Sequence, residues 1–235
     1  MNIKEMHYDF KIKRNKIDSQ QYRNLLVPEI DWLLNSAIEV FVKMTMNPRY
    51  NPIPGFEKTQ RDRDDLKNLV INNYIINHSS SNNNEYVYEL PSDYIFYISA
   101  NISMYKEYCG IKQGRAMVRQ HDDEFQLSPF DKSSYEWGEV NVVFNNQGIK
   151  AFADNSFDLR ELKLNYLQQH PYIHNAEDFT NNTYTTLEGL VLTGTQDCIL
   201  SEHTHSEIVD VAVLLATQNL QIPDYQVIMN KLKLT

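Results

Sequence analysis

Residues 28–46, PEIDWLLNSAIEVFVKMTM, are the stretch that decides the fold. Their apolar side chains recur every three or four positions, which is the period of an α-helix with one buried face. Pro28 suits the first turn of a helix, and Pro48 ends it. Glu29 and Asp31 place negative charge at the positive end of the helix dipole. We therefore predict a helix with a buried stripe of Ile30, Leu33, Leu34, Ala37, Ile38, Phe41 and Val42.

Two more helices are expected around this one. Residues 59–76 place Leu66, Leu69, Val70 and Tyr74 on one face, after a mixed-charge first half that suits a salt-bridged surface. A polar loop, NHSSSNNN, should follow at residues 77–84. Residues 201–219 carry a broad apolar stripe, with Ser201 as a possible cap at its start and Pro223 beyond its end.

The middle of the chain has the period of β-strands. Apolar and polar residues alternate over residues 96–104 and again over 115–120. Between residues 138 and 166, two turn sequences separate three strand-like segments: Asn145 to Gly148, and Asp154 to Ser156. We interpret this region as a β-meander. Residues 8–13 alternate as well, which indicates a short strand or an extended arm.

These patterns predict an α+β protein. Helices from the N- and C-terminal parts should pack together, with a β-rich antiparallel meander in the middle. The expected boundaries are an extended basic arm at 1–17, a helical part at 18–85 plus 200–220, a β-rich part at 86–199, and a C-terminal tail at 221–235.

Composition narrows the class of protein. The chain has 235 residues and a formal charge of −9, which argues against a dedicated nucleic-acid-binding module. Residues 1–16 carry a local excess of positive charge, which fits either a grip on a partner or a solvated end. The 15 tyrosines suit surfaces covered by another protein, or equally a tyrosine-rich core. We see neither a signal peptide nor an apolar run long enough to span a membrane.

Candidate chemical groups are few. His203 and His205, with Glu202 beside them, are spaced poorly for metal binding from one helix. The run His121 to Glu124 suits an acidic turn better than a cation site. Asp62, Asp64 and Asp65 alternate with arginines as on a salt-bridged helix. Cys109 and Cys198 form neither a metal spacing nor a disulfide framework, and we treat Cys109 as a small apolar residue. We therefore predict no catalytic, cofactor-binding or metal site, and the test of the metal prediction is metal analysis of wild type and His205→Ala.

Several segments together resemble the ring, or head-to-tail adaptor, proteins of crAss-like tailed phages. The resemblance extends over most of residues 20–220 and rests on the order of these segments. They are PEIDWLLNSAIEVFV (28–42), FEKTQRDRDDLKNLV (56–70), LPSDYIFYISANISMY (90–105), RQHDDEFQLSPFDKSSY (119–135), NSFDLRELKLNYLQQHPYI (155–173) and LSEHTHSEIVDVAVLLATQNL (200–220).

The resemblance implies a structural role, not an enzymatic one. It implies a homo-oligomeric ring with the symmetry of the portal, about a dozen copies, that joins the portal to tail components in the virion. It also implies partners: the chain itself, the portal, other ring or tail proteins, and DNA that passes without specific binding. Assembly would take place in the host cytoplasm, with no membrane involved. A virion-associated enzyme or cargo protein is the alternative function.

The two ends receive an expectation of their own. Residues 1–17 and 221–235 are expected to reach beyond their own subunit, because an extended segment can add to a neighbour's sheet edge and an apolar tail is unsuited to water. The alternative is that both ends pack on their own domain.

Overall fold

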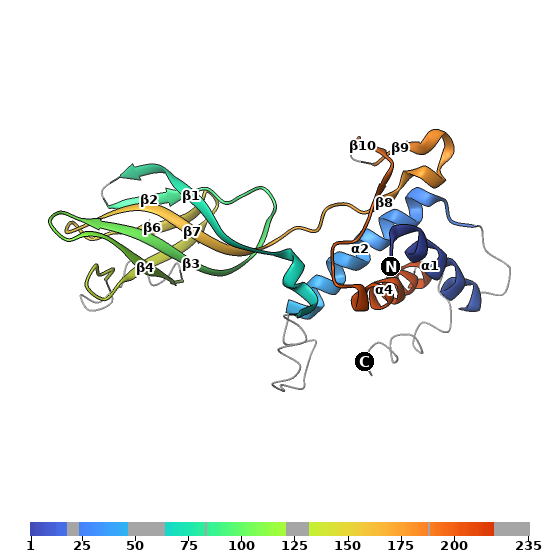
Figure 1. Cartoon of the computed structure of the whole chain (residues 1–235), viewed down its shortest axis with the longest axis horizontal. Coiled ribbons are helices and arrows are strands. Elements are labelled where there is room, and N and C mark those ends of the chain that lie inside the picture. The colour runs from blue at the N-terminus through green and yellow to red at the C-terminus, as the bar shows by residue number, and fades with distance from the viewer. Residues whose placement is uncertain (18–23, 47–63, 83, 121–131, 188, 219–235) are drawn as a thin grey trace, which may run out of the picture. The chain divides into compact units, whose positions relative to one another are not determined.

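The computed structural model describes residues 1–17, 24–46, 64–82, 84–120, 132–187 and 189–218 (Figure 1). The chain divides into two compact units. One unit comprises residues 1–69 and 170–235, and the other comprises residues 70–169. The α+β class is confirmed: the first unit holds the long helices and the second is a β-barrel.

In the part that the structure describes, the long helices of the first unit are α1 (Ile3–Ile17), α2 (Val27–Met46) and α4 (His205–Gln218). All seven apolar residues expected on the stripe of α2 are buried, so that prediction is confirmed. α4 packs against both α2 and α1. Within the described ranges, no helix is both long and apolar enough to cross a membrane.

Short elements complete this unit. Two small antiparallel sheets form, one from β8 (His174–Asn175) with β11 (Thr195–Gln196) and one from β9 (Thr183–Thr185) with β10 (Val191–Thr193). Ala176, Tyr184 and Leu192 form a small apolar core beneath the second sheet. Single 3-10 turns connect the elements: η1 (Lys67–Leu69), η3 (Ala176–Asp178), η4 (Thr180–Asn182) and η5 (Glu202–Thr204).

The second unit is a closed barrel in the order β1-β2-β6-β5-β4-β3-β7. Closure leaves no continuous sheet edge free. Neighbouring strands are antiparallel except for β4 and β5, which run parallel. Gly148 begins β6 with φ of +131°, and a Cβ there would overlap the Tyr88 carbonyl oxygen. The strands are β1 (Val70–Asn82), β2 (Glu85–Tyr88), β3 (Tyr94–Lys106), β4 (Gly110–Val118), β5 (Glu139–Asn145), β6 (Gly148–Phe152) and β7 (Asp158–Gln168).

The expected extended arm at residues 1–17 is wrong, because this segment is the helix α1. Ile3, Met6 and Phe10 recur at helical spacing and are buried. Asn2 and Glu5 form a reciprocal capping box: each backbone N–H donates to the other's side chain, at 2.9 and 2.8 Å. The alternation at residues 8–13 is therefore incidental, and α1 packs on its own unit through α4.

The expected helix at residues 59–76 and loop at 77–84 are also wrong in the part that the structure describes. Residues 59–63 lie outside the described residues, and helical turns extend only from Asp64 to Leu69. The strand β1 then runs through both predicted segments. β-branched residues are dense in its first half, VINNYII, and Ile76 enters the barrel core.

The meander is confirmed only as far as its first hairpin, in which β5 and β6 pair across the turn at residues 145–148. β6 then pairs with β2, and β7 lies between β1 and β3. The β-rich unit therefore spans 70–169 instead of 86–199. Residues 170–199 return to the helical unit, where Ile173 and Leu200 are buried.

Ala37 provides a test of the helical core. It has no exposed surface on α2, so Ala37→Asp buries an uncompensated carboxylate and should cost several kcal/mol, comparable with a whole domain's stability of about 5–15 kcal/mol. We expect the helical unit not to fold, as measured by circular dichroism and by the recovery of soluble protein. Met44→Asp adds the same group at an exposed site of α2 and should fold. An unchanged melting temperature for Ala37→Asp would contradict this packing.

Candidate functional site

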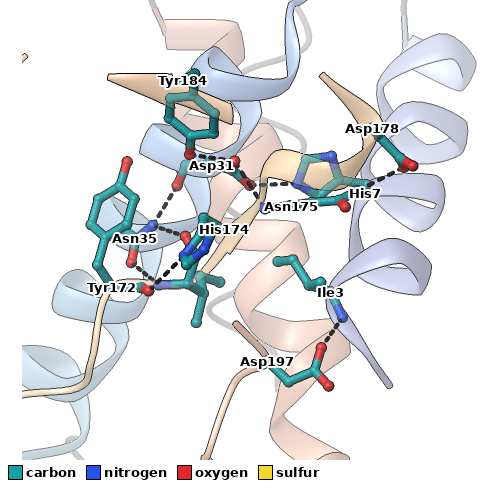
Figure 2. Close-up of polar contacts among 11 residues, drawn as sticks. Ile3, His7, Asp31, Asn35, Tyr172, His174, Asn175, Asp178, Tyr184 and Asp197 are labelled. Carbon is teal, nitrogen blue, oxygen red and sulfur yellow. Dashed lines mark hydrogen bonds and ion pairs between the residues drawn. The ribbon is translucent and has the colours of Figure 1, made fainter. Parts of the chain in front are cut away.

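Asp31 on α2 accepts three hydrogen bonds, although its side chain has no exposed surface. His7 of α1 donates from Nε2 to Oδ1 over 2.7 Å. The hydroxyl of Tyr184 on β9 donates to Oδ2 over 2.6 Å, and the backbone N–H of Asn175 on β8 donates to the same oxygen over 3.2 Å. Figure 2 shows these donors converging on the carboxylate. An isolated buried carboxylate would be strongly destabilising, so these contacts are what allow its burial.

The protonation of Tyr184 suits it to this position. Burial, followed by the hydrogen bond to Asp31 and the charge of that carboxylate, raises the pKa of the Tyr184 hydroxyl far above its ordinary value. The phenol therefore stays protonated and acts as a donor. His7 and Tyr184 are themselves buried, so the three side chains form a closed internal contact.

Asn35, one turn after Asp31, extends the contact to the chain beside β8. Its side-chain amide donates to the carbonyl oxygens of Asp31 and Ile173, at 2.7 and 2.8 Å. Its side-chain oxygen accepts the N–H of Ile173 at 2.9 Å, as a neighbouring strand would (Figure 2). At the start of α1, the Ile3 N–H donates to Asp197 at 2.7 Å. The segments before and after the barrel are thus joined by polar contacts. We call the group Asp31, His7, Tyr184, Asn175 and Asn35 the Asp31 centre.

The Asp31 centre stabilises the fold and is closed to a reacting molecule. Its carboxylate, imidazole and phenol resemble an acid–base set in composition. A reacting molecule would need access to them, and all three side chains are shielded from solvent. We interpret the centre as a buried hydrogen-bond network that holds α1, α2 and the β8–β9 region together.

The sequence interpretation missed the centre, although one signal was present. Asp31 lies near the start of α2, a position that indicates an interaction with the helix dipole. It also stands three residues before Leu34 and seven before Ile38, on the stripe expected to be buried. A carboxylate on an apolar stripe requires partners, but their identity was not visible in the sequence.

The structure does not bring together Glu202, His203 and His205, to which we assign no metal from the sequence. His203 contacts the buried Asp65 over 2.5 Å. His205 is buried and donates from Nε2 to the Leu200 carbonyl over 3.0 Å. Glu202 has a side chain 91% exposed, 3.9 Å from the N-terminal amine. Within the described part of the chain, no three His, Cys, Asp or Glu side chains are placed to hold a metal ion.

The carboxylates of the 62–65 region differ from the expected salt-bridged surface. Asp65 is buried against His203, while Asp64 is exposed. Asp62 lies outside the described residues, as does the acidic run His121 to Glu124.

Cys198 and His170 form a pair that the sequence did not suggest. The sulfur lies 3.4 Å from Nε2 of His170, which also accepts the Ile199 N–H at 3.1 Å. Burial raises the pKa of the Cys198 thiol to about 11 and lowers the pKa of His170. Both groups are therefore neutral near pH 7, unlike the thiolate and imidazolium of a cysteine nucleophile. Cys109, treated as a small apolar residue, is instead exposed between β3 and β4.

Tyr184→Phe tests the Asp31 centre. It keeps the ring and removes one donor from the buried carboxylate, which should lower the free energy of unfolding by about 1.5–3 kcal/mol. We expect a fall in melting temperature of about 2–4 °C for each kcal/mol. Tyr108→Phe makes the same change on a side chain that is 97% exposed and should leave the melting temperature unchanged. Equal melting temperatures for the two variants would show that the centre does not stabilise the unit.

The two cysteines should differ in reactivity. A thiol reagent such as a maleimide should modify Cys109 first. Cys198 should react at least about tenfold more slowly, because it is buried and its pKa is raised. Mass spectrometry of protein quenched at intervals measures both rates, with Cys109→Ser as the control that leaves only the slow site. Similar rates at the two positions would contradict the neutral, buried state of Cys198.

No family model matches the chain, and no curated protein matches it in sequence.

Proposed function

We propose that this chain is a structural subunit of a head-to-tail connector ring of a tailed phage, placed between the portal and tail components. The ordered set of segments that resembles ring proteins of crAss-like phages suggests the proposal. The physical support comes from the surface, where large apolar side chains are displayed at defined places.

The observation that carries the proposal is the exposed turn between β3 and β4 together with the loop before β5. Tyr108 is 97% exposed, Trp137 is 83% exposed, and Ile111 is exposed as well. We call these three side chains the barrel tip. Tyr108 also has a positive φ of 64°, which is uncommon for an aromatic residue. Tyrosine and tryptophan are enriched among the side chains that dominate protein–protein binding energies. Their exposure favours a surface that another protein covers.

The barrel tip is held in a fixed arrangement. The Tyr135 hydroxyl donates to the carbonyl oxygens of Cys109 and Gly110, at 3.3 and 3.1 Å. Lys112 donates to the carbonyl oxygens of Tyr135 and Glu136, at 3.1 and 2.7 Å. These contacts tie the loop to the β3–β4 turn. A surface ordered before binding loses less entropy when a partner covers it.

The tyrosines support both interpretations that the composition left open. Tyr88 and Tyr166 are core residues, and their hydroxyls donate to the Arg160 carbonyl and to Asp93. Tyr8 and Tyr108 are surface residues. The net charge of −9 suits a protein that lines a channel through which DNA slides, because negative side chains disfavour the binding of phosphate groups.

The alternative, a virion-associated enzyme or cargo protein, gains little from the described side chains. The Cys198–His170 pair is the arrangement closest in type to a nucleophile with a base. Its neutral, buried state gives it no activated nucleophile.

Assembly with the portal protein encoded in the same genome tests the proposal. We expect the mixture to elute from size exclusion as one complex, with light scattering giving about a dozen copies of this chain per portal ring, and electron microscopy to show a ring. The double variant Tyr108→Ser, Trp137→Ser should bind at least about tenfold more weakly, since two exposed aromatic anchors are lost. Ile75→Ser removes an exposed apolar side chain from β1 and serves as the matched control.

The outcomes separate the two parts of the proposal. A wild-type chain that never associates with the portal contradicts the connector function. A double variant that assembles like wild type excludes the barrel tip as the contact. In that case the observed assembly with the portal still supports the connector function.

A further inference from the structure

α1 has a second face that the described residues of its unit leave open. Ile3, Met6 and Phe10 point into the core, whereas Met1, Tyr8 and Ile12 follow the outer side at helical spacing. With Ser206 at the start of α4, the outer residues line an open groove of about 620 Å³. Tyr8 is 69% exposed there. A tyrosine ring in an open groove offers contact area to a further segment.

We propose that residues 219–235 of the same chain bind in this groove. They follow directly after Gln218, the last residue of α4. From Ser206 to Gln218 the helix rises about 18 Å. The seventeen residues from Asn219 to Thr235 can extend about 56 Å. The segment is therefore long enough to reach from the end of α4 to any part of the groove.

The composition of this segment fits the groove. Tyr225, Ile228 and Leu232 recur at intervals of three and four, a spacing that gathers apolar side chains on one side. Met1, Tyr8 and Ile12 offer apolar surface along the groove. A segment this apolar is stabilised by covering such a surface.

Charge favours the same pairing. The segment carries Lys231 and Lys233 against a single acidic side chain, Asp224. Glu5 and Asp9 line the groove, and the exposed Glu202 lies near the N-terminal amine. Lys4, the basic side chain of the lining, already pairs with Glu177 over 2.8 Å. Asp9 also pairs with Lys13 over 2.9 Å. Glu5 and the exposed Glu202 are therefore the carboxylates best placed to meet the two lysines of the segment.

Attachment favours the chain's own groove over that of a second copy. Covalent attachment to the same chain gives the segment an effective concentration in the millimolar range, which exceeds ordinary protein concentrations. Because α1 lies on its own unit, the groove is already present in a single copy. This inference does not rest on the proposed connector function.

Hydrogen exchange on the full-length protein tests the inference. Mass spectrometry should show backbone amides of residues 219–235 exchanging at least about tenfold more slowly than a free peptide of the same sequence. Tyr8→Glu and, separately, Ile12→Ser should remove that protection while leaving the amides of α2 and α4 unchanged. Tyr108→Glu introduces the same charge at an exposed tyrosine of the barrel and should leave the protection intact.

Carbodiimide cross-linking of mixed ¹⁴N- and ¹⁵N-labelled protein identifies the copy. We expect Lys231 or Lys233 joined to Glu5 or Glu202 within one isotopic form. Exchange of residues 219–235 at the free-peptide rate overturns the inference, as does protection that both groove variants retain. Cross-links between isotopic forms overturn it in favour of a second copy. Exchange in α2 and α4 reports separately whether each variant is folded.

Discussion

The burial of Asp31 is the constraint on which the helical unit depends. A carboxylate without exposed surface requires hydrogen-bond donors. The three donors to Asp31 are separated from it in the sequence by 24, 144 and 153 positions. α1, α2 and the β8–β9 region must therefore come together before the charge is compensated (Figure 2). One chemical requirement, the compensation of this buried charge, therefore depends on contacts between segments that are far apart in the sequence. Hydrophobic stripes alone would allow α1 more than one way to pack.

The barrel is compatible with this arrangement because its two ends meet within its own sheet. Val70, its first residue, pairs with Leu167 near its last. An insertion whose ends lie side by side can interrupt another unit without separating the residues that unit must join. The closure that brings β1 beside β7 also supplies each strand with a neighbour, which limits unwanted edge pairing.

Two buried acid–base groups contrast with the exposed aromatic side chains of the barrel tip. The groups with acid–base chemistry, at Asp31 and at Cys198, are buried and neutral or compensated. The aromatic groups best suited to binding, at Tyr108 and Trp137, are exposed on a turn held by Tyr135. This distribution is consistent with the assembly role that we propose.

The sequence by itself determined the local features: the stripe of α2, the α+β class and the turn between β5 and β6. In each case the decisive residues lie within one element or one turn. Residues 3–17 carry local helix signals too, in the spacing of Ile3, Met6 and Phe10 and in the capping pair Asn2 and Glu5, which the alternation at residues 8–13 obscured. Only the tertiary structure decided that residues 70–76 form a strand. It also decided that β6 pairs with β2, and which donors Asp31 receives. An apolar period shows which face of a segment is buried. Sheet neighbours and hydrogen-bond donors come from distant segments, so only the folded chain selects them.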